Sequence, residues 1–130
     1  MIIDGSHNQQ KIQTLLESVA QLYPNQSIAA LCAFVQGNSE RWQGGLSELL
    51  PAANYILFTT FHGEQDVPKS SIPTVALAAF CREQHYTNFG IEDDPAAALQ
   101  ALLARPEPVL LVTGSFYLLN HVRPFIRSLQ

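Results

Sequence analysis

The sequence predicts an α/β domain in which helices cover both faces of a mainly parallel sheet, giving three layers. Short apolar runs alternate with amphipathic stretches along the chain, which is typical of strand–helix–strand units. The runs are too short for helices and are compatible with strands covered on both faces. These predicted strands are Met1 to Ile3, Ser27 to Phe34, Asn54 to Thr59 and Val109 to Thr113.

Helices are predicted between these strands and after the last one. The clearest follows the first strand and ends at Tyr23-Pro24-Asn25. Asp94 and Pro95 begin an equally clear helix, because Asp is a favoured N-cap and Pro a favoured first helical residue. The others cover Ser39 to Leu50, follow Ser71, and start near Phe116 with Pro124 limiting or kinking the end. The residues predicted to face inward are Ile12, Leu15, Leu16, Val19, Leu22, Val75, Leu77, Ala78, Cys81, Ala98, Leu99, Leu102 and Leu103.

Composition narrows the function classes. The 130 residues fit a single domain, residues 1–130, that needs no disulfide or structural metal. A net charge of -4 with only 7 Lys and Arg residues gives no basic surface for nucleic acid. No apolar run is long enough to span a membrane, and the N-terminus lacks the pattern of a signal peptide. A cytoplasmic protein fits best.

Several residues are interpreted as structural. Cys32 and Cys81 lie in apolar runs without CxxC spacing, so we expect buried thiols rather than a redox or metal site. Asp93 and Asp94 indicate a helix start rather than a metal site, and His62 a solvated loop histidine. Asp66 to Pro73, with two prolines and two serines, is the expected mobile loop.

Polar residues gather where the first strand ends, in Asp4-Gly5-Ser6-His7-Asn8. Because ligands of open α/β sheets bind at the carboxyl ends of strands, this segment faces the expected site. Asp4 suits ribose hydroxyls, His7 suits a carboxylate or phosphate, and the helix N-terminus that follows favours an anion. The structural alternative is that Ser6 or Asn8 only caps the helix and Asp4 supports the turn.

The last strand ends in a similar segment, Val112-Thr113-Gly114-Ser115-Phe116-Tyr117. It again places a glycine and a hydroxyl between a strand and a helix. Ser115 is either a ligand-binding hydroxyl or only the N-cap of the helix, with Phe116 and Tyr117 in the core. Neither segment identifies a function by itself.

Together the two segments resemble the DGAHN and VTGSxY segments in the C-terminal domain of folylpolyglutamate synthase and dihydrofolate synthase, members of the Mur ligase superfamily. Their order, their separation by nearly a whole domain and the α/β rhythm between them agree with that family. The resemblance covers nearly the full chain. It implies a Rossmann-like domain that binds the incoming L-glutamate and closes over ATP.

The resemblance also implies a reaction and a partner. In the family, ATP phosphorylates the terminal carboxylate of dihydropteroate or a folate, and the amine of glutamate attacks the acyl phosphate. ATP and its magnesium are held mainly by a central P-loop ATPase domain. This chain has no GxxxxGK[ST] motif, so we expect that domain to be absent from it and to be its docking partner.

Carried over by position, Asp4 and Asn8 are expected to contact the nucleotide, and His7 and Ser115 to hold glutamate carboxylates. No catalytic or metal-ligating residue is assigned. Family members usually carry a Lys-Asp pair after the second strand, whereas Phe34 to Trp42 contains no lysine and Arg41 is at best a displaced substitute. Trp42 itself is expected either to contact the missing domain or to be partly buried.

The expected function is therefore one domain of an ATP-dependent ligase, inactive when isolated. The alternative is a non-catalytic interaction or small-molecule-binding module of the same fold. The missing lysine and the altered first segment, with Ser6 for Ala and Gln9 for Pro, favour that alternative.

Overall fold

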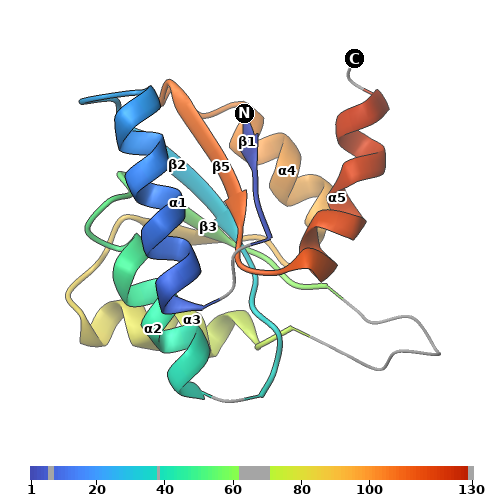
Figure 1. Ribbon diagram of the computed structural model, residues 1–130. Coiled ribbons are helices and arrows are strands. Elements are labelled where there is room, and N and C mark those ends of the chain that lie inside the picture. The colour runs from blue at the N-terminus through green and yellow to red at the C-terminus, as the bar shows by residue number, and fades with distance from the viewer. Residues whose placement is uncertain (6–7, 38, 62–70, 129–130) are drawn as a thin grey trace.

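The computed structural model describes residues 1–5, 8–37, 39–61 and 71–128. Within these ranges, five parallel strands form one sheet in the order β1-β5-β2-β3-β4 (Figure 1). The strands are β1 (Ile2–Ile3), β2 (Ile28–Cys32), β3 (Tyr55–Phe58), β4 (Phe89–Ile91) and β5 (Val109–Thr113). The helices are α1 (Gln9–Leu22), α2 (Ser39–Leu49), α3 (Thr74–Glu83), α4 (Pro95–Leu103) and α5 (Phe116–Ser128). The predicted α/β class with a parallel sheet is confirmed.

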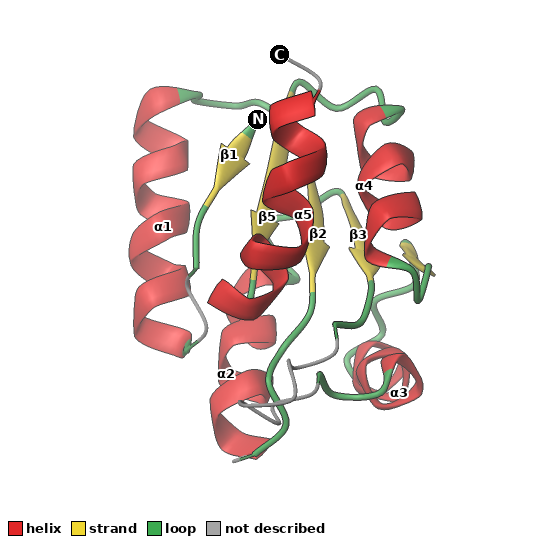
Figure 2. Ribbon diagram, turned by 90° about the vertical axis from the view of Figure 1, so that its right-hand side faces the viewer, coloured by secondary structure: helices red, strands yellow, loops and turns green. Residues whose placement is uncertain are grey.

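The sheet lies between two layers of helices. Helices α1, α2 and α3 cover one face, and α4 and α5 cover the other, where α5 lies in front of the sheet in Figure 2. Successive residues of β2 alternate between the two cores: Ala30 and Cys32 pack on the α1–α3 side, and Ala29 and Leu31 on the α4–α5 side. Because every residue of β2 is buried, its apolar run has no polar alternation.

Two glycines in α2 allow that helix to approach α1 closely. A Cβ added to Gly45 would lie 2.9 Å from Cδ1 of Ile12, and one added to Gly44 would lie 3.2 Å from Cβ of Gln9. These glycines lower helix propensity, but they remove the atoms that would push the two helices apart. Trp42 of the same helix is buried, with its ring packed edge-on against Phe80, so of the two expected alternatives the structure supports burial rather than an exposed domain contact.

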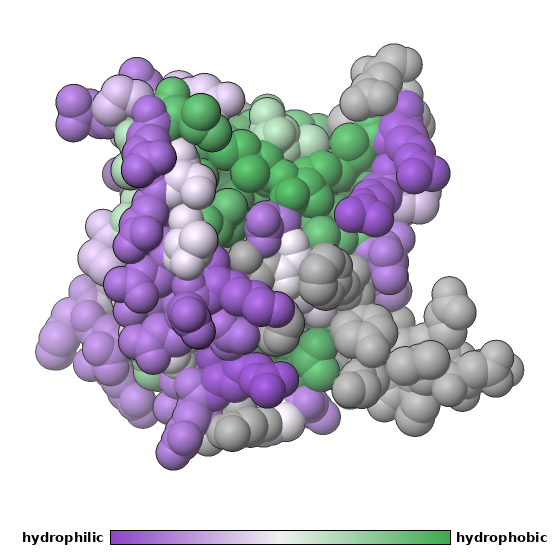
Figure 3. Space-filling view, viewed as in Figure 1, coloured by the Kyte–Doolittle hydropathy of each residue, from purple (hydrophilic) through white to green (hydrophobic). Residues whose placement is uncertain are grey.

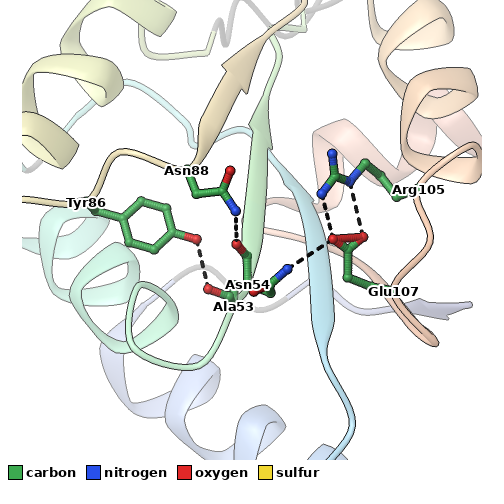
Figure 4. A network of polar contacts seen from close by, with 6 residues as sticks. All are labelled: Ala53, Asn54, Tyr86, Asn88, Arg105 and Glu107. Atoms are coloured by element: carbon green, nitrogen blue, oxygen red, sulfur yellow. Dashed lines mark hydrogen bonds and ion pairs between the residues drawn. The ribbon is translucent and has the colours of Figure 1, made fainter.

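Polar contacts join the chain segments that enter β3, β4 and β5, at the amino ends of the strands (Figure 4). Buried Glu107 accepts two hydrogen bonds from Arg105, at 3.1 and 2.6 Å, and one from the amide of Asn54 at 3.2 Å. The guanidinium of Arg105 also lies 3.9 Å from the ring centroid of Tyr55.

The same network extends toward β4. Tyr86 donates its hydroxyl proton to the carbonyl of Ala53 at 2.8 Å, and the amide of Asn88 donates to the carbonyl of Asn54. The residues just before three strands are therefore held to one another by side chains, which fixes the amino end of the sheet.

Some predictions at the level of elements are wrong. Strand β4 was not expected, because its apolar content is only Phe89 and Ile91 on either side of a glycine. Val75 and Leu22 were expected inside but are 72% and 70% exposed. Val75 lies on the outer side of α3, and Leu22 is the last residue of α1.

Other predictions concern element ends. Helix α5 continues through Pro124 to Ser128. Pro124 has no N–H to donate to the carbonyl of Asn120. Both residues are exposed, so water can donate to that carbonyl instead.

Of the expected mobile loop, residues 66–70 lie outside the described ranges. Its last residues are packed: Ser71 and Ile72 are buried, and the N–H of Ile72 donates to the carbonyl of Phe34.

The interpretation of the cysteines is confirmed, because Cys32 and Cys81 are both free thiols in the core. A search of the described residues for a helix with the length and apolar content needed to cross a bilayer gives none.

Candidate functional site

The two polar segments, which lie about a domain apart in the sequence, meet in the fold. Strand β1 pairs with β5 so that Ile3 lies opposite Val112, and the N–H of Asp4 donates to the carbonyl of Val112 at 2.9 Å. The chain leaves β1 toward α1 on one face and leaves β5 toward α5 on the other (Figure 1). Neighbouring strands whose connections diverge in this way form the crevice in which open α/β sheets bind ligands.

The first segment contributes a half-buried carboxylate and a helix cap. Asp4 directly follows β1 at the carboxyl edge of the sheet. Asn8 is the N-cap of α1, and its Oδ1 accepts a hydrogen bond from the N–H of Lys11 at 2.9 Å. Asn8 thus has the capping role that the sequence left open, while its amide nitrogen and the second lone pair of Oδ1 can still make other contacts. Ser6 and His7 lie outside the described residues, so the role expected of His7 stays a prediction.

In the second segment, the backbone makes a turn that only glycine tolerates. Gly114 has φ +108°, and a Cβ at this position would lie 2.5 Å from the carbonyl oxygen of Ala33. This glycine therefore lets the end of β5 lie directly against the residue that follows β2. Ser115 comes next, immediately before α5, and is only 1% exposed. It has the position of an N-cap, and its hydroxyl does not face open solvent.

Further along the same edge, β3 ends at a hydroxyl that sequence reasoning missed. Thr59 is fully buried, and its Oγ1 has no hydrogen-bond partner within the described ranges. Such atoms are uncommon in folded proteins, because each one loses its hydration without compensation. The only signal in the sequence was its place at the end of the third predicted strand. His62, three residues on, lies outside the described ranges.

The acid pair beyond β4 has structural partners. Asp93 accepts a hydrogen bond from the hydroxyl of Thr74 at 2.9 Å, and Asp94 caps α4 by accepting from the N–H of Ala97 at 3.0 Å. The prediction of a helix start is confirmed. Across the described part of the chain, no group of three or more His, Cys, Asp and Glu side chains is placed to hold a metal ion.

A polar groove opens beside the first segment, between the starts of α1 and α2. It has a volume of about 630 Å³ and is lined by Asn8, Gln9, Gln10, Gln13, Glu40 and Arg41. Arg41, which the sequence offered as a displaced substitute for the lysine of the family, therefore lies in the same groove as Asn8 at the candidate site.

The described residues suit binding better than covalent chemistry. The cysteines are not available as nucleophiles, because burial raises the pKa of the Cys81 thiol to about 11 and that of Cys32 well above its ordinary value. What the edge offers is a carboxylate at Asp4, a groove containing a guanidinium, and the beginnings of two helices.

Comparisons with known proteins identify the family and the fold. The sequence model of the family described as "Mur ligase, glutamate ligase domain" matches residues 1–116. The dihydrofolate synthase/folylpolyglutamate synthase of Bacillus subtilis (strain 168) is 23% identical over 123 residues, which are 93% of this chain and 26% of that protein.

Solved structures have the same fold. E. coli FolC in complex with ADP aligns with a TM-score of 0.75 and 20% identity, over 97% of this chain and 29% of that one. Folylpolyglutamate synthase from Thermotoga maritima aligns with a TM-score of 0.76 and 16% identity, over 98% and 27% of the two chains. This chain thus spans between 26% and 29% of the length of these relatives.

Proposed function

Because the chain belongs to the Mur ligase glutamate ligase domain family, we propose that it is the C-terminal, glutamate-binding domain of an ATP-dependent amide ligase of the folylpolyglutamate synthase or dihydrofolate synthase type. The observation that carries the proposal is the meeting of the Asp4 and Gly114–Ser115 segments at one edge of the sheet. Both segments that resemble the family lie where a parallel sheet binds its ligands.

In this proposal the chain binds and orients substrates. ATP, when bound, supplies the phosphoryl group that turns the terminal carboxylate of a folate or of dihydropteroate into a reactive acyl donor. Asp4 accepts hydrogen bonds from the ribose hydroxyls, and His7 and Ser115 hold carboxylates of L-glutamate. Closure of the domain then brings the glutamate amine to the acyl carbon and keeps water away from it. Since Ser115 is buried, its contact requires a small opening of the turn at Gly114.

Magnesium and the triphosphate are placed on the P-loop domain of the complete enzyme, as the resemblance to the family implies. Among the described residues of this chain, no group of three or more His, Cys, Asp and Glu side chains is placed to hold a metal ion. The docking of this domain to that partner, within the cytoplasm, belongs to the same proposal.

Reconstitution tests the proposal. The chain is mixed with the N-terminal portion of a matching ligase, ATP, labelled L-glutamate and either dihydropteroate or a folate, and glutamate addition is followed by mass spectrometry. We expect product only when both portions are present, and less product with Asp4→Ala. Activity from this chain alone, or none with any matching portion, contradicts the proposal.

A non-catalytic module of the same fold remains the second candidate. It is favoured by the capping role of Asn8 and the burial of Ser115, which use two of the four expected site residues for structure. The same reconstitution separates the two, because a module of this kind binds its ligand without supporting glutamate addition.

A further inference from the structure

Another pocket lies at the amino end of the sheet, between the ends of α2 and α3, and is called here the α2–α3 pocket. It has a volume of about 280 Å³. The chain enters β3 shortly after α2 and β4 shortly after α3, so the length of the sheet separates this pocket from the Asp4 and Gly114 segments. The lining comes from the two helix ends: Ser47, Leu50, Pro51, Gln84, His85 and Tyr86.

Part of the lining is apolar and fixed in place. Leu50 and Pro51 contribute aliphatic surface, and Tyr86 contributes an aromatic ring. The ring cannot turn freely, because its hydroxyl donates to the carbonyl of Ala53 at 2.8 Å (Figure 4). Ligand sites commonly have volumes of about 300 to 1,000 Å³, so a pocket just below that range suits a ligand with one ring or a short aliphatic body.

The backbone of α2 supplies a hydrogen-bond acceptor. In a helix, the carbonyl of residue 47 accepts from the N–H of residue 51, but Pro51 has no N–H. The next two N–H groups, those of Ala52 and Ala53, both donate to the carbonyl of Leu49 at 3.0 Å. The carbonyl of Ser47 therefore lacks the donor that a helix would supply, and Ser47 and Pro51 both line the pocket.

The helix ends also set the charge preference of the pocket. None of its six described lining residues is Asp, Glu, Lys or Arg. The unpaired carbonyls at a helix C-terminus carry a partial negative charge, and two helices end here. Arg82, the basic residue in the last turn of α3, lies 5.8 Å from the ring centroid of Phe89 and is not part of the lining. A cation is therefore favoured over an anion.

The surroundings indicate a small ligand rather than a protein surface. In the face shown in Figure 3, hydrophilic residues cover the left side, where α2 and α3 end in Figure 1. The hydrophobic band of that face lies higher, toward β1 and β5. Large exposed apolar patches mark protein contacts, and this pocket is not continuous with one in that view.

We propose that the α2–α3 pocket binds a small amine with an apolar body. The protonated amine donates to the carbonyl of Ser47, and the body packs against Leu50 and the ring of Tyr86. His85 forms the remaining wall, although its φ of +60° is one that residues other than glycine seldom adopt. The proposal does not depend on the proposed ligase function, because the pocket lies at the opposite end of the sheet.

NMR titration of the isotope-labelled chain tests the site with three probes of similar shape and different charge. They are phenethylamine, 2-phenylethanol and 3-phenylpropionate, used at about pH 8, where an imidazole is ordinarily neutral. Phenethylamine is expected to shift the signals of Leu50, Gln84 and Tyr86. The alcohol should bind more weakly, and the carboxylate should leave these signals unchanged.

Two variants test the assigned contacts. Pro51→Ala restores an N–H that can donate to the carbonyl of Ser47, so it should weaken phenethylamine binding by about threefold or more. Pro24→Ala, at an exposed position that does not line the pocket, is the matched control and should leave binding unchanged. His85→Gly removes the imidazole wall and should weaken the binding of phenethylamine and of 2-phenylethanol alike.

The site is overturned if phenethylamine shifts none of the lining residues, or if 3-phenylpropionate shifts them as strongly. Unchanged phenethylamine binding in both Pro51→Ala and His85→Gly overturns it as well. A loss in His85→Gly without one in Pro51→Ala contradicts the contact with the Ser47 carbonyl. None of these measurements uses ATP, L-glutamate or a partner domain, so failure here leaves the ligase proposal to its own reconstitution test.

Discussion

At the amino ends of its strands the sheet is tied together by side chains, whereas at the carboxyl ends it holds a buried hydroxyl without a described partner and a glycine at positive φ. Glu107, itself buried, receives three hydrogen bonds. Thr59, equally buried, has none for its hydroxyl in the described ranges. Hydrogen bonds also join segments beyond the carboxyl ends, where Asp93 accepts from the hydroxyls of Thr60 and Thr74. The two ends therefore differ in that the end where ligands are expected tolerates an unsatisfied buried hydroxyl beside its stabilising contacts, as functional sites often do.

The largest effect is expected at the carboxyl end, from Gly114→Ala. The new Cβ would lie 2.5 Å from the backbone oxygen of Ala33, in a left-handed conformation that alanine disfavours. Strain and overpacking together should lower the free energy of unfolding by about 3 kcal/mol or more. Unfolding in urea measures this loss in the free energy of unfolding.

Gly37→Ala is the control for Gly114→Ala, because Gly37 also has positive φ, +153°, but among the described residues other than its chain neighbours no atom lies within 4 Å of its added Cβ. A small loss in this variant isolates the contact with Ala33. Equal losses in the two variants would show that backbone conformation alone matters and that the ends of β5 and β2 are not closely packed.

At the amino end, Glu107→Ala should lower the free energy of unfolding by about 2 kcal/mol, since it leaves the amide of Asn54 without an acceptor and Arg105 without its partner. The loss stays below that of a fully buried pair because the Arg105 side chain is 31% exposed and can turn to water. Glu17→Ala, at an exposed position of α1, should change stability by less than about 0.5 kcal/mol. A loss in Glu107→Ala as small as in this control would contradict the network.

Acid should weaken the amino end selectively. The hydrogen bonds from Arg105 hold the pKa of Glu107 below its ordinary value. With a folded pKa below the unfolded one, the stabilisation is complete above the unfolded value of about 4.3 and is lost as pH falls through the folded pKa. Glu107→Gln should therefore be less stable than wild type at pH 7, by about 1 kcal/mol, and approach it in acid. A difference that is the same at pH 7 and pH 3 would exclude the charge as its source.

Thr59→Val tests whether the buried hydroxyl at the carboxyl end lowers the free energy of unfolding. Valine has nearly the same shape and no hydroxyl, so the variant should gain about 1 kcal/mol by removing the unsatisfied group. Thr74→Val is the matched control, because its hydroxyl bonds to Asp93 and its loss should destabilise. Thermal unfolding of the two variants should shift in opposite directions. A destabilised Thr59→Val would mean that its hydroxyl is satisfied in solution.

The two ends of the sheet also differ in how much of their structure could be predicted from the sequence. The meeting of the two segments followed from their residues and from the rule that parallel strands end at a common edge. The roles of Asn8 and Ser115 did not, because a residue between a strand and a helix suits a cap and a ligand equally well until its burial and partners are known.

The contacts of the amino end gave no sequence signal at all. Glu107 and Asn54 are 53 residues apart, and nothing in the local pattern of either residue indicates the other. Strand β4 escaped prediction for a related reason, since three residues at a sheet edge need little apolar content to pair with β3.

The smallest effect should come from His85→Gly, at the amino end. His85 follows Gln84, the C-cap of α3, and has φ +60°. Its N–H donates to the carbonyl of Arg82, and the N–H of Tyr86 donates to the carbonyl of Cys81. This is the position where glycine usually ends a helix. Relief of the side-chain strain, less the extra freedom of glycine in the unfolded chain, should raise stability by about 0.5 kcal/mol.

Asn25→Gly is the control for His85→Gly, because Asn25 has nearly the same φ, +61°, but asparagine tolerates it better and should gain less. L-glutamate binding should be unchanged in both variants. If His85→Gly instead weakens that binding, strain at the amino end is transmitted across the sheet, and the two ends are not independent. If L-glutamate binding is unchanged while stability rises, relief of strain at the amino ends of the strands does not reach the ligand-binding edge, and the two ends are independent.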